Sequence, residues 1–174
     1  MTRNQSTALP IAYVFLRLLI LLNWFVGAGI LALLIGMFVA PHWTFTALGI
    51  PDSWEAQPVM MGLRAIGAFG LVGIPLNDAI LRRLLAIVVT VRRGEPFVPL
   101  NAYRLQTIAW LLLALQVLSL VIGAIGKGIS TSAHPIHLDA GFSPSGWLAV
   151  IFTFVLARVF AEGTLMREDL EGTV

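Results

Sequence analysis

The sequence contains no cysteine, and this absence excludes several kinds of chemistry at once. Disulfide bonds, thiolate metal sites, iron–sulfur clusters and cysteine nucleophiles all need a residue that none of the 174 positions provides. Charged residues are also scarce, at 11% of the chain, whereas a typical soluble domain has about 25%. A chain with so few charges cannot cover its apolar surface in water, so we expect the lipid bilayer to be its solvent.

Long apolar runs fill most of the remaining sequence, of which 58% is hydrophobic. They predict an all-α integral membrane protein, a four-helix bundle formed by a single transmembrane domain over residues 1–174. The first run far exceeds the apolar region of a cleavable signal peptide, which has about 7–15 residues, so we expect it to remain as a membrane helix. The predicted spans are at about residues 11–39, 59–80, 104–125 and 144–163.

The segments between and after the spans differ in character. Residues 41–58 are expected to form an outer loop, and residues 164–174 a polar tail. Residues 81–103 are expected to form a stem and a linker, in which the second helix continues as an amphipathic extension to Arg93. Gly94 is typical of a position just after a helix C-terminus, and the prolines that follow prevent continuation.

The basic residues predict the orientation. They lie in the N-terminal segment, in the stem and linker, and near the C-terminus, whereas the two opposite loops hold only Lys127. The positive-inside rule then places both termini and the central stem in the cytoplasm. The residues concerned are Arg3, Arg17, Arg82, Arg83, Arg92, Arg93, Arg104, Arg158 and Arg167.

Charges within or beside the spans are candidates for function, because they are costly in a bilayer. These candidate intramembrane polar residues are Arg64, Asp78 and Arg158. One interpretation is an ion or proton path through the bundle. We favour the other, in which the charges are structural: Asp78 pairs with Arg82, Arg158 pairs with Glu162, and Arg64 lies near the outer headgroups and reaches Glu55.

Patterns typical of enzymes or cofactor sites are incomplete. His134, His137 and Asp139 could supply part of a divalent-metal site, but a solvated loop is the favoured interpretation. The glycines around Lys127 depart from the phosphate-binding loop pattern at two positions. No histidine lies on the predicted cytoplasmic side, so no Ser-His-acid set can form there. We therefore expect no enzymatic activity, no cofactor and no metal.

The predicted cytoplasmic surface is the most distinctive part of the chain. It combines the basic stem, the Gly-Glu-Pro-Phe-Val-Pro linker and a tail of alternating charge. Two compatible interpretations are a stem lying on anionic lipid and a docking face for a soluble protein. The candidate docking residues are Arg82, Arg83, Arg92, Arg93, Glu95, Phe97, Asn101, Arg104, Glu162, Arg167, Asp169 and Glu171.

These segments also carry a family resemblance. The residues concerned are Gly94-Glu95-Pro96-Phe97-Val98, Asn101, Arg104-Leu105 and Trp110, then Val155-Leu156-Ala157, Val159-Phe160, Glu162-Gly163 and the ending from Asp169 to Val174. Over roughly residues 81–174 the chain resembles domain-of-unknown-function family 2975. The resemblance implies a multi-pass protein of the bacterial inner membrane with four helices and no established activity. It further implies a relation to a small Cro-like helix-turn-helix regulator, which members of the family are often encoded beside.

The function expected from residues and resemblance together is therefore that of a non-enzymatic membrane binding protein that sequesters a cytoplasmic helix-turn-helix regulator. One alternative is an accessory subunit of a larger membrane complex, held by the glycine-rich faces of the first two spans, which would also permit a homo-oligomer. A second alternative is a small transporter or channel. The expected partners are membrane lipid and another protein, with no direct contact to nucleic acid.

Overall fold

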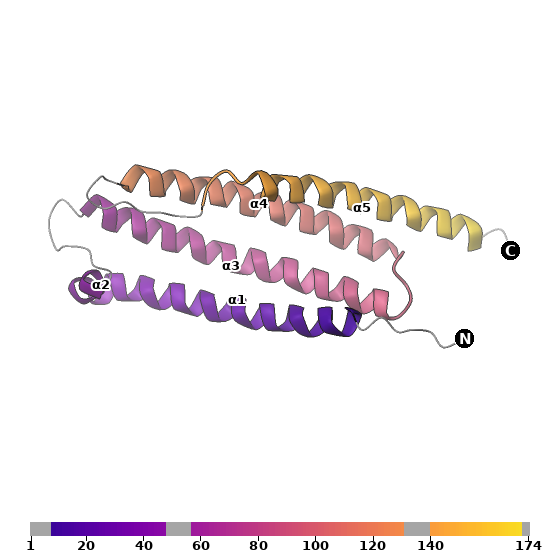
Figure 1. The fold of residues 1–174 in the computed structure, drawn as a ribbon, viewed down its shortest axis with the longest axis horizontal. Coiled ribbons are helices and arrows are strands. Elements are labelled where there is room, and N and C mark those ends of the chain that lie inside the picture. Colours follow the sequence, from indigo (N-terminus) through magenta and orange to yellow (C-terminus); the bar gives the residue numbers. More distant parts are fainter. Residues whose placement is uncertain (1–7, 48–56, 131–139, 172–174) are drawn as a thin grey trace.

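The computed structural model of the chain describes residues 8–47, 57–130 and 140–171, and all regular structure in these ranges is helical (Figure 1). Four helices in this part of the chain are long and apolar enough to cross a membrane, as the hydropathy pattern predicts. The helices are α1 (Ala8–Val39), α2 (Pro41–Ala47), α3 (Gln57–Arg92), α4 (Pro99–Ile129) and α5 (Pro144–Glu171).

Each long helix contains one predicted span and extends beyond it. Helix α3 continues without a break from its apolar part through the basic stem to Arg92. It ends there because Gly94 takes a left-handed conformation, with φ 84°, and Pro96 follows. Helix α4 begins at Pro99, where the missing N–H of proline leaves no helical hydrogen bond unmade.

The short helix α2 corrects the expectation that residues 41–58 form a loop throughout. Pro41 opens this helix, and the side chains of Thr44 and Thr46 donate hydrogen bonds of 2.9 Å to the carbonyls of Ala40 and His42. Each bond spans one helical turn and replaces water as the partner of the hydroxyl. Such bonds to the carbonyl one turn earlier allow both threonines to lie in a regular helical turn directly after α1.

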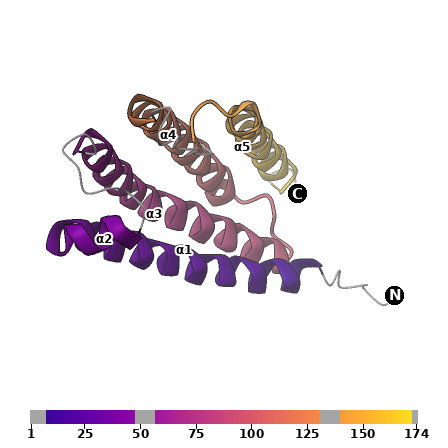
Figure 2. The same cartoon turned by 60° about the vertical axis from the view of Figure 1, so that its left-hand side comes forward.

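The four long helices form an open row rather than closing around a common centre (Figure 2). Helix α3 packs against α1 and α4, and α4 packs against α5, while in the described residues α5 makes no contact with α1. The two edge helices therefore leave wide apolar faces uncovered, on which Phe25 of α1 is 77% exposed and Phe152 of α5 is 64% exposed. Lipid or another membrane protein is the natural cover for such faces.

Small residues set the spacing within the row. A side-chain carbon at Gly62 of α3 would lie 2.5 Å from Ile129 of α4, and one at Gly67 would lie 3.0 Å from Leu34 of α1. Both glycines therefore allow α3 to approach its two neighbours closely, which is how membrane helices gain packing energy without a hydrophobic driving force. The glycines of α3 serve contacts within one chain.

Candidate functional site

The connection between α3 and α4, residues 93–98, forms a sharp elbow that Asn101 of α4 holds in place. The Asn101 side chain is completely buried. Its amide nitrogen donates to the Thr90 hydroxyl at 2.7 Å and to the Pro96 carbonyl at 2.9 Å, while its oxygen accepts a bond of 2.9 Å from Arg104. One side chain thus joins the last turn of α3, the elbow and the first turns of α4.

The backbone of the elbow is bonded to the end of α3 as well. The amide of Glu95 donates to the Thr90 carbonyl at 3.1 Å, and the amide of Gly94 donates to the Val91 carbonyl at 3.0 Å. These bonds satisfy carbonyls that the end of a helix would otherwise leave without a partner. The elbow is therefore a fixed element that holds Arg93 and Glu95 in defined positions.

Phe97 connects the elbow to α5. Its ring lies 5.4 Å from the ring of Phe160, centroid to centroid, at an angle of 39°. A side-chain carbon at Gly163 would lie 3.0 Å from the Phe97 ring, so the glycine provides the space that this ring occupies. The N-terminal end of α1, the elbow and the C-terminal end of α5 all lie at one end of the molecule (Figure 1).

The predicted docking residues divide into exposed and inward-turned groups at this end. Arg83 and Arg104 turn back to the carbonyls of Ala79 and Ala86, at 3.0 and 3.4 Å. Asp169 and Glu171 belong to α5 by their backbone, but their side chains are not among those described. The exposed members are Arg82, Arg92, Arg93, Glu95, Phe97, Glu162 and Arg167.

Asn101 requires a correction. We expected it among the docking residues, but its side chain has no exposed surface. The amide is surrounded by the elbow that it bonds, so it supports the surface from within and cannot touch a partner. A polar residue near prolines and charges reads as exposed in the sequence, and only the fold brings Thr90 and Arg104 around it.

The candidate intramembrane charges all make local structural contacts. Asp78 accepts a hydrogen bond of 2.6 Å from Arg82, and Arg158 donates one of 2.8 Å to Glu162. Both ion pairs that the helical spacing predicts are therefore confirmed. Arg64 donates a hydrogen bond of 2.6 Å to the backbone carbonyl of Met37. This carbonyl belongs to the last turn of α1, where a cation satisfies an orphan acceptor and complements the helix dipole.

Two further observations concern Arg64. Its guanidinium carbon lies 4.5 Å from the centre of the Phe38 ring, a cation–π contact that also belongs to the end of α1. Glu55, the partner expected from the sequence, lies outside the described residues. In the described part of the chain, Arg64 thus contacts the end of α1. The hydropathy of the sequence does not show that α1 lies beside Arg64.

A polar contact between α1 and α3 was missed by the sequence analysis. The side chain of Asn77 donates a hydrogen bond of 2.9 Å to the side-chain oxygen of Asn23. Asn23 in turn donates one of 3.1 Å to the backbone carbonyl of Ile74, which precedes Pro75 within α3. Trp24 adds a bond of 3.0 Å to Asp78. The two asparagines were the available signal, because an amide within an apolar span needs a hydrogen-bond partner and finds it most easily on a neighbouring helix.

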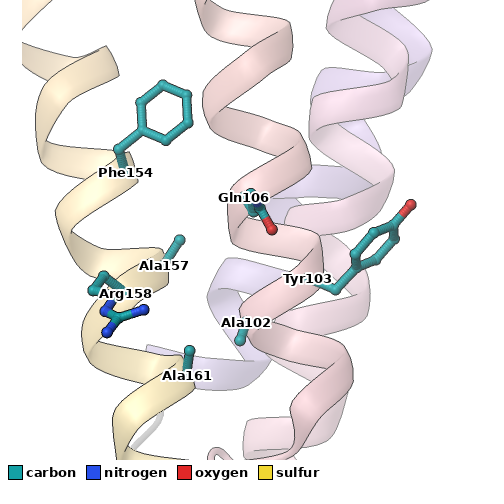
Figure 3. A pocket seen from close by; sticks show the side chains of 7 residues that line it. All are labelled: Ala102, Tyr103, Gln106, Phe154, Ala157, Arg158 and Ala161. Carbon is teal, nitrogen blue, oxygen red and sulfur yellow. The ribbon is translucent and has the colours of Figure 1, made fainter.

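A shallow groove of about 340 Å³ runs between α4 and α5 near the elbow end (Figure 3). Its wall on the α5 side is formed by Phe154, Ala157, Arg158 and Ala161, and small side chains leave the space open. It lies between two aromatic contacts with α5. Phe97 of the elbow contacts Phe160, and Trp110 of α4 contacts Phe154 with 5.2 Å between ring centres. Ala102, Tyr103 and Gln106 line it from α4.

No group of three histidine, cysteine or acidic residues lies close enough to hold a metal ion in the described parts of α1 to α5. The pair His134 and His137, with Asp139, lies outside the described residues. What the described site offers is an exposed charged surface on a rigid elbow.

Comparison with known proteins identifies a family. The sequence pattern of a family described as "Protein of unknown function (DUF2975)" matches residues 79–174, which is more than half of the chain. The matched part begins near Asp78 and comprises the stem, the elbow, α4 and α5. No curated protein and no solved structure matches the chain.

Proposed function

This chain belongs to the family described as "Protein of unknown function (DUF2975)", and we propose that it is a non-enzymatic membrane protein whose elbow end docks a soluble cytoplasmic protein. The observation that carries the proposal is the elbow itself. A buried asparagine with three hydrogen bonds holds a short connection in one conformation, and the charged residues on that connection point outward. A surface fixed before binding loses little entropy when a partner arrives.

The charge of the surface indicates the partner's chemistry. Arg92 and Arg93 are exposed at the elbow beside Glu95, whereas Arg82 is paired with Asp78 and Glu162 is paired with Arg158. We therefore expect an acidic surface on the partner, which would also be attracted over long range. The resemblance stated for the elbow sequence favours a small helix-turn-helix regulator as that partner, held away from its DNA target at the inner membrane of a bacterium.

The placement of this end in the cytoplasm is part of the proposal. The basic residues of the stem support it through the positive-inside rule. The arrangement of the helices is consistent with it, because the N-terminal end of α1, the elbow and the C-terminal end of α5 lie together (Figure 1). A single soluble partner could then reach all three.

The test is a charge reversal at the elbow. Arg93→Glu changes an exposed residue that lies next to the fixed backbone, so we expect at least tenfold less partner recovered when the tagged protein is purified from its native membrane in mild detergent. The matched control is Lys127→Glu, which makes the same change near the opposite end of α4. Equal recovery by both variants and the unchanged protein would refute the docking surface.

A second candidate function is that of an accessory subunit in a larger membrane complex. The open row favours it, because α1 leaves one long apolar face without a helical neighbour in the described residues. In this case the purified protein would migrate with other integral membrane proteins at a fixed ratio. The effect of Arg93→Glu would then be small, since the contact would be made within the bilayer.

A further inference from the structure

A cluster of two arginines and one tyrosine lies at the elbow end, apart from the docking residues of α5. The guanidinium carbon of Arg17 lies 4.7 Å from the centre of the Tyr13 ring, and that of Arg92 lies 5.3 Å from the same centre. Tyr13 and Arg17 come from adjacent turns of α1, and Arg92 is the last residue of α3. Two helices therefore bring two positive charges to one aromatic ring.

The cluster has no counter-ion in the described part of the chain. The salt bridges described there join Arg82 to Asp78 and Arg158 to Glu162, and neither involves Arg17 or Arg92. Glu95, the carboxylate of the elbow, forms no salt bridge with either of them in the described residues. Two cations on one ring repel each other, and an anion bound between or beside them would offset this repulsion.

The position of the cluster along the helices matches a lipid headgroup. The helix that can span the membrane in α1 begins at Leu9, and the one in α3 continues through the basic stem to Arg92. Tyr13 therefore lies about 6 Å along the helix from this start, at 1.5 Å per residue, and tyrosine is a residue enriched at membrane interfaces. Helical side chains lean toward the N-terminus, which brings the Arg17 guanidinium back to the level of Tyr13.

From this geometry we propose that Tyr13, Arg17 and Arg92 form a binding site for the phosphate of an anionic phospholipid. The guanidinium groups present a planar fork of N–H donors that suits phosphate oxygens, and the aromatic ring holds both groups in place. The positive end of the α1 dipole lies on the same side and adds to the attraction. The lipid chains would lie along the exposed apolar surface of α1.

The site differs from general attraction of a basic stem to a negative membrane. General attraction depends on the number of charges near the surface, so every exposed arginine of the stem contributes about equally, at about 1 kcal/mol each. A built site depends on the arginines that share the ring. Arg93 is the matched control, because it is exposed, adjacent to Arg92, and makes no cation–π contact in the described residues.

The experiment is native mass spectrometry of the full chain in neutral detergent, titrated with phosphatidylglycerol or with phosphatidylcholine. We expect at least tenfold preference for phosphatidylglycerol. Arg17→Gln or Arg92→Gln should each weaken its binding about tenfold, the loss of one charge-assisted contact, and Arg93→Gln should leave it within about twofold. Tyr13→Leu, which keeps both charges but removes the ring that holds them, should also weaken it.

Three results would overturn the proposal. Equal losses for Arg92→Gln and Arg93→Gln would show diffuse surface charge instead of a site. No preference between the two lipids would show that the arginines do not select a charged headgroup. Displacement of the bound lipid by inorganic phosphate at millimolar concentration would show that the cluster takes a free anion. Circular dichroism of each variant, with unchanged helix content, ensures that the losses come from binding.

Discussion

Replacing Asn101 with alanine tests whether one buried side chain fixes the elbow. The change removes two bonds donated by the amide, at 2.7 and 2.9 Å, and one accepted from Arg104 at 2.9 Å. A net hydrogen bond contributes about 0.5–1.5 kcal/mol, and one to a charged group about 1.5–3 kcal/mol. Membrane proteins lie toward the low end of such values, so we expect a loss of about 3 kcal/mol.

The assay is unfolding of the purified protein in mixed micelles with increasing dodecyl sulfate, followed by tryptophan fluorescence. The control is Gln106→Ala, which removes an exposed amide from the next turns of the same helix and should cost less than about 0.5 kcal/mol. Thr90→Val should cost less than Asn101→Ala, and the double variant should cost less than the sum, since both changes remove the same bond. A loss below about 0.5 kcal/mol for Asn101→Ala would refute the account of the elbow.

Two further predictions concern contacts between helices. Gly123→Ala should destabilise the protein in the same assay by about 1–3 kcal/mol, as overpacking does, because its side chain would lie 2.7 Å from the backbone oxygen of Ala140; unchanged stability would contradict this close approach. Asn23→Leu should cost about 1–3 kcal/mol, since it leaves the Asn77 amide and an α3 carbonyl without their partner. Adding Asn77→Leu should recover part of that loss, and a simple sum of the two losses would contradict the pairing.

Much of the helical architecture could be predicted from local features of the sequence. Apolar runs identify the membrane helices, because a segment surrounded by lipid must be apolar along its whole length. The two ion pairs, Asp78 with Arg82 and Arg158 with Glu162, follow from a spacing of one helical turn. The end of α3 follows from Gly94 and the prolines after it. Each of these features depends on neighbours within one helix.

The contacts between helices could not be predicted in the same way. Asn23 and Asn77 are 54 positions apart, and nothing in either segment states that these two residues face each other. Hydropathy likewise does not say that the helices form an open row, because lipid and protein are similar solvents for an apolar face. The burial of Asn101 depends on the elbow folding back onto Thr90. These are the features on which the candidate site rests.

The same limit explains why the charge pattern of the site was only partly predicted. The sequence places several arginines near one end of the helices but does not distinguish Arg83, which bonds its own helix, from Arg93, which is exposed. It also gives no sign that Arg17 and Arg92 meet at Tyr13, since this contact joins two helices. The tertiary structure thus separates an arginine bonded to its own helix, exposed arginines and arginines that share an aromatic ring, which look alike in sequence.

Site-specific photo-crosslinking in living cells tests the central claim, docking of a soluble partner at the elbow end, most directly. A photoreactive residue at Glu95 would report on the elbow, and one at Thr46 in α2 would report on the opposite end of the row (Figure 1). We expect an adduct with a soluble cytoplasmic protein from position 95 and none from position 46. Adducts from position 46 alone, or none from position 95, would contradict docking at the elbow.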